Sequence, residues 1–89
     1  MEIRKINMLG MELTEWKHKS CRAEFGVADN YATLYYIESK EKGKGHASEL
    51  LIVAKKLYEY LGKKFGGSVA LSKEMRSIYR KLKIHEYDE

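Results

Sequence analysis

The sequence contains no proline and only one cysteine, Cys21, among its 89 residues. Without proline, the usual marker of loops is missing, so turns must be located from glycine, asparagine and aspartate. A single cysteine cannot form an internal disulfide, so no covalent cross-link holds the fold together. No apolar stretch approaches the roughly 20 residues of a membrane-spanning helix, and Met1-Glu2-Ile3-Arg4 does not resemble the start of a signal peptide. We therefore expect a cytoplasmic protein that does not enter membranes.

Length and charge set further bounds. A chain of 89 residues forms one domain, over residues 1–89, with a small core, because it buries only about 60–65% of its unfolded surface. A ligand is therefore expected in a groove. Seventeen basic and thirteen acidic side chains give a net charge of +4. This charge favours an anionic partner, but it does not choose between nucleic acid, a phosphate cofactor and an acidic protein.

The first 40 residues are predicted to be mainly strands. Loose alternation over 1–9 indicates an edge strand, and 13–18 is either a second strand or one helical turn. The extended runs 21–28 and 31–38 flank Asp29-Asn30, a pair that tolerates turn conformations, and so predict an antiparallel hairpin. An exposed edge strand in so small a chain also favours a homodimer.

The rest of the chain alternates helix and strand. The first predicted helix places its apolar residues at spacings of three and four: Ala47, Leu50, Leu51, Ala54, Leu57, Tyr58 and Leu61. Gly62 ends this helix. A short buried strand is expected over 67–71, then a second helix capped by Ser72, with the apolar residues Met75, Ile78, Tyr79 and Leu82, and a final strand over 84–87. A strand-helix-strand unit implies parallel strands joined by a right-handed crossover. The predicted fold is α/β: a mixed sheet of antiparallel N-terminal strands followed by β-α-β-α-β, with helices packed on the sheet.

The segment 42–47, Lys-Gly-Lys-Gly-His-Ala, lies between a predicted strand and the first helix. Its glycines allow the backbone to approach a ligand, and the helix N-terminus adds free amides and partial positive charge, which together suit a phosphate. A solvated turn explains the spacing equally well. The segment is not a Walker loop, because Gly45 is followed by His46-Ala47, and it lacks the third glycine of a dinucleotide fingerprint, where Ser48 stands.

The same segment resembles the Arg/Gln-x-x-Gly-x-Gly/Ala signature of the GCN5-related N-acetyltransferases, the GNAT superfamily. Further on, residues 78–84 (Ile-Tyr-Arg-Lys-Leu-Lys-Ile) are similar to that family's Leu-Tyr-Glu-Lys-Leu-Gly-Phe segment. The resemblance covers about 31–87. Lys42 departs from the usual Arg or Gln, Lys83 replaces a glycine, and the region before the hairpin is shorter than in full-length members. The chain is similar to a minimal member, of the size of the small anti-CRISPR acetyltransferases that phages encode.

The resemblance implies acetyl-CoA as the cofactor and assigns residues to it. Backbone amides of the loop and the first helical turn would hold the pyrophosphate, with lysines adding charge at the mouth and His46 facing solvent or a phosphate. Main-chain groups at the bend of the central strand would pair with the pantetheine arm. The implied cofactor-binding residues are Ile37, Ser39, Lys42, Gly43, Lys44, Gly45, His46, Ala47 and Ser48.

The resemblance also implies that Tyr79 protonates the departing CoA thiolate, although Tyr79 equally suits the apolar face of its helix. The transfer is mild, because a thiol has a pKa near 8.5 and a phenol near 10. The amine acceptor must lose a proton, and Glu38, Glu24 and His18 are the candidate bases, of which we place Glu38 in the catalytic site.

Other chemistry is less favoured by the sequence. Cys21 has no evident histidine partner for nucleophilic catalysis, and no metal-ligand spacing is present. Trp16 is expected to be a lid or core residue. Tyr35 and Tyr36, as neighbours in a strand, are expected to point to opposite faces, so that at most one lines an acceptor groove.

The sequence thus predicts an acetyl-CoA-dependent N-acetyltransferase that moves an acetyl group to a primary amine by direct attack on the thioester. The acceptor would be a protein lysine, an N-terminus or a small amine. A catalytically inactive GNAT-like regulator or inhibitor is the alternative. Nucleic-acid binding through the helix lysines ranks last, because acidic residues are interspersed among them and no known reading module is present.

Overall fold

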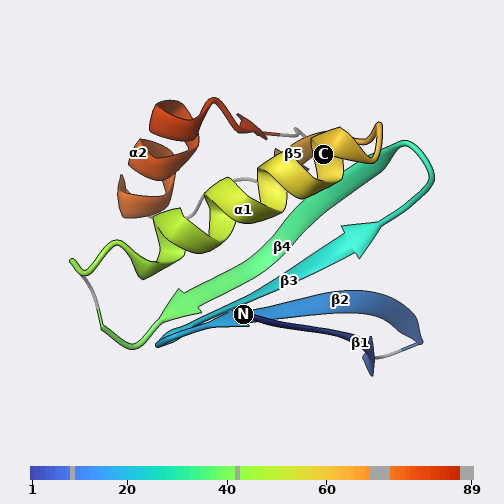
Figure 1. Ribbon diagram of the computed structural model, residues 1–89, viewed down its shortest axis with the longest axis horizontal. Coiled ribbons are helices and arrows are strands. Elements are labelled where there is room, and N and C mark those ends of the chain that lie inside the picture. The colour runs from blue at the N-terminus through green and yellow to red at the C-terminus, as the bar shows by residue number, and fades with distance from the viewer. Residues whose placement is uncertain (9, 42, 69–72, 87–89) are drawn as a thin grey trace.

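The computed structural model describes residues 1–8, 10–41, 43–68 and 73–86 (Figure 1). In chain order its elements are β1 (Glu2–Met8), β2 (Met11–His18), β3 (Cys21–Val27), β4 (Tyr31–Ser39), α1 (His46–Tyr60), β5 (Lys64–Gly67), α2 (Lys73–Leu82) and β6 (His85–Glu86). The strands form one mixed sheet whose spatial order follows the chain order. Neighbours from β1 to β4 are antiparallel, whereas β4, β5 and β6 are parallel. The predicted α/β class and mixed sheet are confirmed.

Both helices lie on the same side of the sheet (Figure 1). The core forms between this side and α1, where Trp16 and Phe25 of the sheet meet Leu50, Leu51 and Tyr58 of the helix. The Trp16 indole Nε1 donates a hydrogen bond of 3.1 Å to the Tyr58 hydroxyl, which satisfies a polar group inside this apolar contact. We call the opposite side of the sheet the open face, because neither helix covers it.

The N-terminal predictions hold in most details. Residues 13–18 belong to β2, so the strand alternative is confirmed, and Gly10 turns the chain between β1 and β2 with a φ of 80°. The hairpin of β3 and β4 forms around Asp29-Asn30 as expected. Trp16 is a core residue, only 1% exposed.

One C-terminal prediction, that of the strand after α1, was wrong in position. β5 covers Lys64–Gly67 rather than 67–71, because Phe65 supplies its buried apolar side chain while Gly66 and Gly67 are buried without one. Residues 69–72, including the predicted cap Ser72, lie outside the described residues. The last strand, predicted over 84–87, is the short β6, and residue 87 is not described.

The predicted apolar face of α1 was too wide. Leu57 is 38% exposed and Leu61 is 55% exposed, so neither belongs to the core. The helix buries Leu50, Leu51, Ala54 and Tyr58 against the sheet; Leu57 borders that stripe, and Leu61 is the C-cap residue just past the helix end.

A β-bulge in β4 corrects the prediction for the paired tyrosines. Glu24 pairs with Tyr36 but Phe25 pairs with Leu34, so Tyr35 is an extra residue in β4. An extra residue interrupts the alternation of side chains. Tyr35 packs over Gly26, Tyr36 lies near Arg22, and both tyrosines therefore project from the open face.

Candidate functional site

A cavity of about 540 Å³ lies where the end of β4, the loop 43–45, the first turn of α1 and one side of α2 meet. Its lining residues are Ile37, Glu38, Ser39, Glu41, Gly43, Gly45, His46, Ala47, Ser48, Met75 and Ile78. The volume falls within the usual range for small-molecule sites, about 300–1,000 Å³.

Most residues implied by the sequence resemblance line this one cavity. They come from two separate segments, 37–39 and 43–48: Ile37, Ser39, Gly43, Gly45, His46, Ala47 and Ser48. Lys44 is exposed and is not among the lining residues. Lys42 lies outside the described residues.

The loop before α1 has the conformation that its glycines permit. Gly43 and Gly45 have φ angles of 80° and 76°, in the left-handed region that disfavours other residues. Gly45 is the N-cap of α1 and supplies no side chain to cap it. The amides of His46, Ala47 and Ser48 therefore begin a helix without a side-chain acceptor from the cap, which leaves donors for a ligand.

The end of β4 leaves the sheet pairing on one side. β4 pairs with β5 only from Tyr31 to Leu34, and the Ser68 amide donates to the Leu34 carbonyl at 2.9 Å where the two strands part. Beyond the bulge, Ile37 and Ser39 continue along β3 and line the cavity. The edge of β4 that β5 no longer covers can offer main-chain groups to an extended ligand.

His46 is fixed by neighbours from another part of the chain. Its Nδ1 lies 2.7 Å from the Ser20 hydroxyl, in the turn between β2 and β3, and that hydroxyl lies 3.4 Å from the Ser39 hydroxyl. His46 is half-buried in the cavity wall rather than fully solvated. The serine contacts hold the imidazole beside the first turn of α1.

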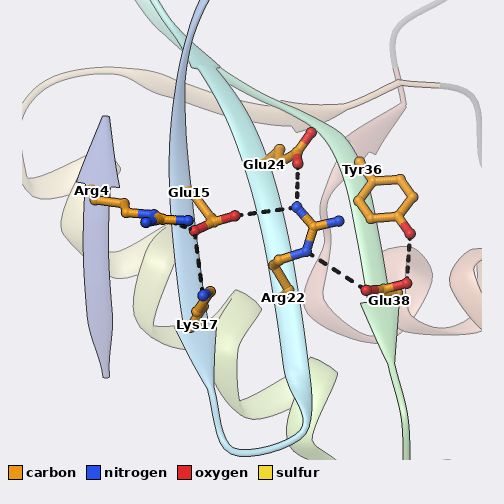
Figure 2. A network of polar contacts seen from close by, with 7 residues as sticks. All are labelled: Arg4, Glu15, Lys17, Arg22, Glu24, Tyr36 and Glu38. Carbon is orange, nitrogen blue, oxygen red and sulfur yellow. Dashed lines mark hydrogen bonds and ion pairs between the residues drawn. The ribbon is translucent and has the colours of Figure 1, made fainter. Parts of the chain in front are cut away.

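Glu38 belongs to a polar network on the open face (Figure 2). The Tyr36 hydroxyl donates to Glu38 Oε2 at 2.7 Å, and Arg22 Nε lies 3.6 Å from Glu38 Oε1. The Tyr36 hydrogen bond and then the Arg22 charge lower the pKa of the Glu38 carboxyl. Glu38 is therefore ionised at neutral pH and is a weak proton acceptor, although it lines the cavity.

The other two candidate bases are not brought to the cavity. His18 Nε2 lies 2.9 Å from Glu49 Oε1 on α1, and Glu24 is buried on the open face, where Arg22 donates to it. Neither His18 nor Glu24 lines the cavity.

Tyr79 is buried, and its hydroxyl donates to the Ser68 carbonyl at 3.1 Å, close to where β4 and β5 part. It packs so closely on Gly67 that a Cβ there would lie 2.1 Å from the hydroxyl. Its neighbour Ile78 lines the cavity, whereas Tyr79 itself does not. The Tyr79 hydroxyl thus lies where β4 and β5 part, next to the turn of α2 from which Ile78 lines the cavity.

Cysteine and metal chemistry find no support in the described residues. Cys21 is buried, and burial followed by the nearby Glu38 charge raises its thiol pKa to about 11. Such a thiol stays protonated and is a poor nucleophile. Among residues 1–8, 10–41, 43–68 and 73–86, no three His, Cys, Asp or Glu side chains gather as metal ligands. Neither described helix has the length and apolar character to cross a membrane.

The sequence reasoning missed four residues around the cavity: Glu41, Met75, Ile78 and Ser20. Met75 and Ile78 were assigned only to the apolar stripe of α2. Both right-handed crossovers place their helices on one face of the sheet. The topology alone would therefore have predicted that this stripe lies beside the start of α1. The contact of Ser20 with His46 joins residues far apart in the chain and leaves no sequence pattern.

Comparisons with protein-family models, with curated proteins and with solved structures return no match to this chain. The function of the protein is therefore inferred from the motif residues and from the geometry of the site.

Proposed function

We propose that the protein is an N-acetyltransferase that takes its acetyl group from acetyl-CoA and transfers it to a primary amine. The observation that carries this proposal is the convergence of the loop 43–48 and the strand segment 37–39 on one cavity. These two segments are the ones that the GNAT resemblance assigns to the pyrophosphate and to the pantetheine arm.

Two backbone features support the resemblance independently of the cavity. The central strand, β4, carries a bulge at Tyr35 and parts from β5 after Leu34, which agrees with the bend that the family's central strand requires. Lys83 stands where the family segment has a glycine, and its φ is 57°, the left-handed conformation that glycine favours.

The residues present fit the proposed cofactor. A Cβ at Gly43 or Gly45 would meet no atom within 4 Å, so these positions border open space into which a ligand can come close. The adjacent amides of α1 suit the pyrophosphate, and the edge of β4 suits the amide groups of an extended arm. When bound, acetyl-CoA would supply an acetyl group activated as a thioester.

The protein's own residues would then act on the acceptor and the leaving group. The acidic residues Glu38 and Glu41 line the cavity and would attract an ammonium group to it, and water or a carboxylate takes the proton that frees the amine. The amine nitrogen forms a bond to the acetyl carbon as the carbon–sulfur bond breaks. Tyr79 is proposed to give its proton to the sulfur, exchanging its hydrogen bond to Ser68 for one to the leaving group.

Titration calorimetry with acetyl-CoA tests the cofactor site. Gly45→Glu should abolish binding, because the carboxylate would project beside the pyrophosphate amides. Gly10→Glu is the matched control: Gly10 has a similar φ of 80° and equally open surroundings, but it lies in the β1–β2 turn, away from the cavity. Failure of the wild-type protein to bind acetyl-CoA, or equal loss in both variants, would refute the proposal.

Turnover of Tyr79→Phe tests the proposed acid. If Tyr79 protonates the leaving thiolate, the variant should lose about a hundredfold or more in kcat, within the range for general acid catalysis, while acetyl-CoA affinity is kept. An unchanged kcat would assign Tyr79 to packing alone.

The second candidate is a catalytically inactive regulator that keeps the cofactor site. The hydrogen bond of Tyr79 to Ser68 and the low basicity of Glu38 favour it. Mass spectrometry of partner proteins incubated with acetyl-CoA separates the two: an acetylated lysine or N-terminus supports the enzyme, and cofactor binding without any acetylated product supports the regulator.

A further inference from the structure

The helix α2 carries a row of exposed cations. Lys73, Arg76 and Arg80 follow one another at spacings of three and four residues, so they share one face of the helix. Lys83 continues the row just past the helix end, and all four side chains are exposed. We call these four residues the basic face.

The basic face points away from the rest of the protein. Met75, Ile78 and Leu82 pack against the core from the other side of α2, and Tyr79 is buried beneath them. None of the four residues of the basic face is among those that line the cavity beside Met75 and Ile78. The basic face is therefore separate from the proposed acetyl-CoA site, and its role does not depend on that proposal.

None of these four cations forms an ion pair or a side-chain hydrogen bond with a residue that the structure describes. The charges of the chain are unevenly divided: residues 1–41 hold six Lys and Arg against seven Asp and Glu, and residues 42–89 hold eleven against six. Acidic residues are interspersed in the sequence, but in three dimensions Glu15 and Glu24 are paired on the open face of the sheet. Glu15 and Glu24 therefore do not offset the charge of the basic face, although Glu74 lies between Lys73 and Arg76 in the sequence of α2.

Helix stability does not explain the basic face. Lys73 and Arg76 occupy the first turn of α2, where the helix dipole favours acidic side chains. Arg76 and Arg80 are like charges four residues apart, which repel each other. Lys83 adopts a left-handed φ of 57° that glycine would adopt at lower cost. Arg80 lies in the last turn, where the dipole favours a cation, but the local structure does not favour the cations at Lys73, Arg76 and Lys83. For these three residues a contact outside the molecule is the better explanation.

We propose that the basic face binds the phosphate backbone of double-stranded nucleic acid without reading its sequence. The helix has 10 residues and holds its cations in a rigid row about 15 Å long, which suits the regular, fixed charges of a duplex. Single-strand binding would need exposed aromatic rings beside the cations, and Tyr79, the aromatic residue of α2, is buried. Membrane insertion would need a free apolar face, which α2 uses in the core.

Fluorescence anisotropy with a labelled duplex of about 20 base pairs tests this proposal. Four phosphate contacts predict that log Kobs falls against log salt with a slope of about −3.6, so affinity should drop about a hundredfold between about 50 and 200 mM salt. A single strand of the same length should bind more weakly.

Matched charge variants locate the surface. Arg76→Gln with Arg80→Gln should reduce the salt slope by about two, since two phosphate contacts are lost. Lys5→Gln with Lys56→Gln removes the same charge from exposed positions on β1 and α1 and should leave the slope nearly unchanged. Thermal melting tests whether the two arginines have a structural role instead. The Arg76→Gln, Arg80→Gln variant should melt at the same or a higher temperature than the wild type, because a repulsion is removed, whereas a structural role would lower the melting temperature.

Three outcomes would overturn the proposal. The first is no binding of the wild-type chain to the duplex at low salt. The second is an equal loss of affinity in the two variant pairs, which would indicate net charge alone. The third is binding to poly-glutamate or to anionic lipid vesicles at least as tight as to the duplex, which would assign the basic face to an acidic protein or a lipid surface.

Discussion

The open face of the sheet and the outer face of α2 use the same residue types in opposite ways. On the open face, Arg4 and Arg22 donate to Glu15, which is only 3% exposed, and Arg22 also donates to Glu24 (Figure 2). On α2, the cations of the basic face meet no described acid. The charged side chains of the open face pair with one another within the fold. Those of the basic face stay exposed and pair with no residue that the structure describes.

The polar network also explains how the open face of the sheet is stable without a helix packed on it. The carboxylates of Glu15 and Glu24 are buried beneath the long side chains of Arg4, Lys17 and Arg22. The aliphatic stems of such residues cover surface while their charged ends stay paired or wet. The open face is therefore closed by side chains instead of by a second layer of helices.

The largest expected effect comes from breaking this network at its centre. Arg22→Met should lower the free energy of unfolding by about 3–5 kcal/mol, because it leaves Glu15 and Glu24 buried with too few donors. Arg80→Met, the matched change on α2, should alter it by less than about 0.5 kcal/mol, because the side chain is exposed and forms no ion pair with any described residue. Urea unfolding measures the free energy of unfolding of both variants. Similar values for the two would contradict the conclusion that Arg22 stabilises the fold and Arg80 does not.

Two close glycine contacts offer the next test. A Cβ at Gly67 would lie 2.1 Å from the Tyr79 hydroxyl, and one at Gly26 would lie 2.3 Å from the Tyr35 ring. The Tyr79 ring is buried and cannot move aside, so Gly67→Ala should destabilise the protein by about 1–3 kcal/mol. Tyr35 is 48% exposed, so its ring can swing into solvent.

Gly26→Ala should therefore cost clearly less than Gly67→Ala in the same unfolding experiment. Adding Tyr79→Ala should relieve much of the Gly67→Ala penalty, since the clashing atoms are removed, and a double-mutant cycle would show a coupling of about 0.5–3 kcal/mol. Additive effects would mean that the two residues do not touch.

Acid should affect the open face through Glu15. Burial by itself raises the pKa of this carboxyl, but hydrogen bonds from Arg4 and Arg22 outweigh burial, and the pKa is lowered from its ordinary value of 4.5. A lowered folded-state pKa means that the unfolded chain binds the proton more readily. The stability contributed by Glu15 is therefore complete above about pH 5 and is lost as pH falls through the folded pKa.

Comparison of the wild type with Glu15→Gln across pH 2–7 measures this contribution. The difference in unfolding free energy should be largest near neutral pH and should shrink below about pH 4.5. A difference that grows on acidification would show that burial, not pairing, dominates at Glu15.

The sequence predicted the parts of the molecule that depend on local pattern. The hairpin around Asp29-Asn30 and the start of α1 after Gly45 follow from turn chemistry and helical periodicity, whereas the loop residues of the cavity were implied by the family resemblance. The bulge at Tyr35 was missed, because an extra residue in a strand depends on its pairing partner. β5 was misplaced because Gly66 and Gly67 are buried by packing, which their own propensity does not favour.

The candidate site divides in the same way. Its glycine loop could be located from residue spacing, but the state of Glu38 could not. That carboxyl is held by Tyr36, two residues earlier on the same strand, and by Arg22, whose contact requires the register of β3 on β4. Side-chain chemistry that depends on sheet register is visible only once the strands are paired.

The smallest effect is expected at Lys83, where stability and binding should move in opposite directions. Lys83→Gly should raise the free energy of unfolding by about 0.5–1 kcal/mol, because glycine adopts the left-handed conformation without strain, partly offset by its greater freedom in the unfolded chain. Lys81→Gly, inside α2, should instead lower it by about 1 kcal/mol. If the basic face binds a duplex, Lys83→Gly should also reduce the salt slope by about one. A variant that is more stable and binds less tightly would show that this lysine serves the surface at the expense of the fold, whereas a less stable variant would place Lys83 among the contacts that hold α2.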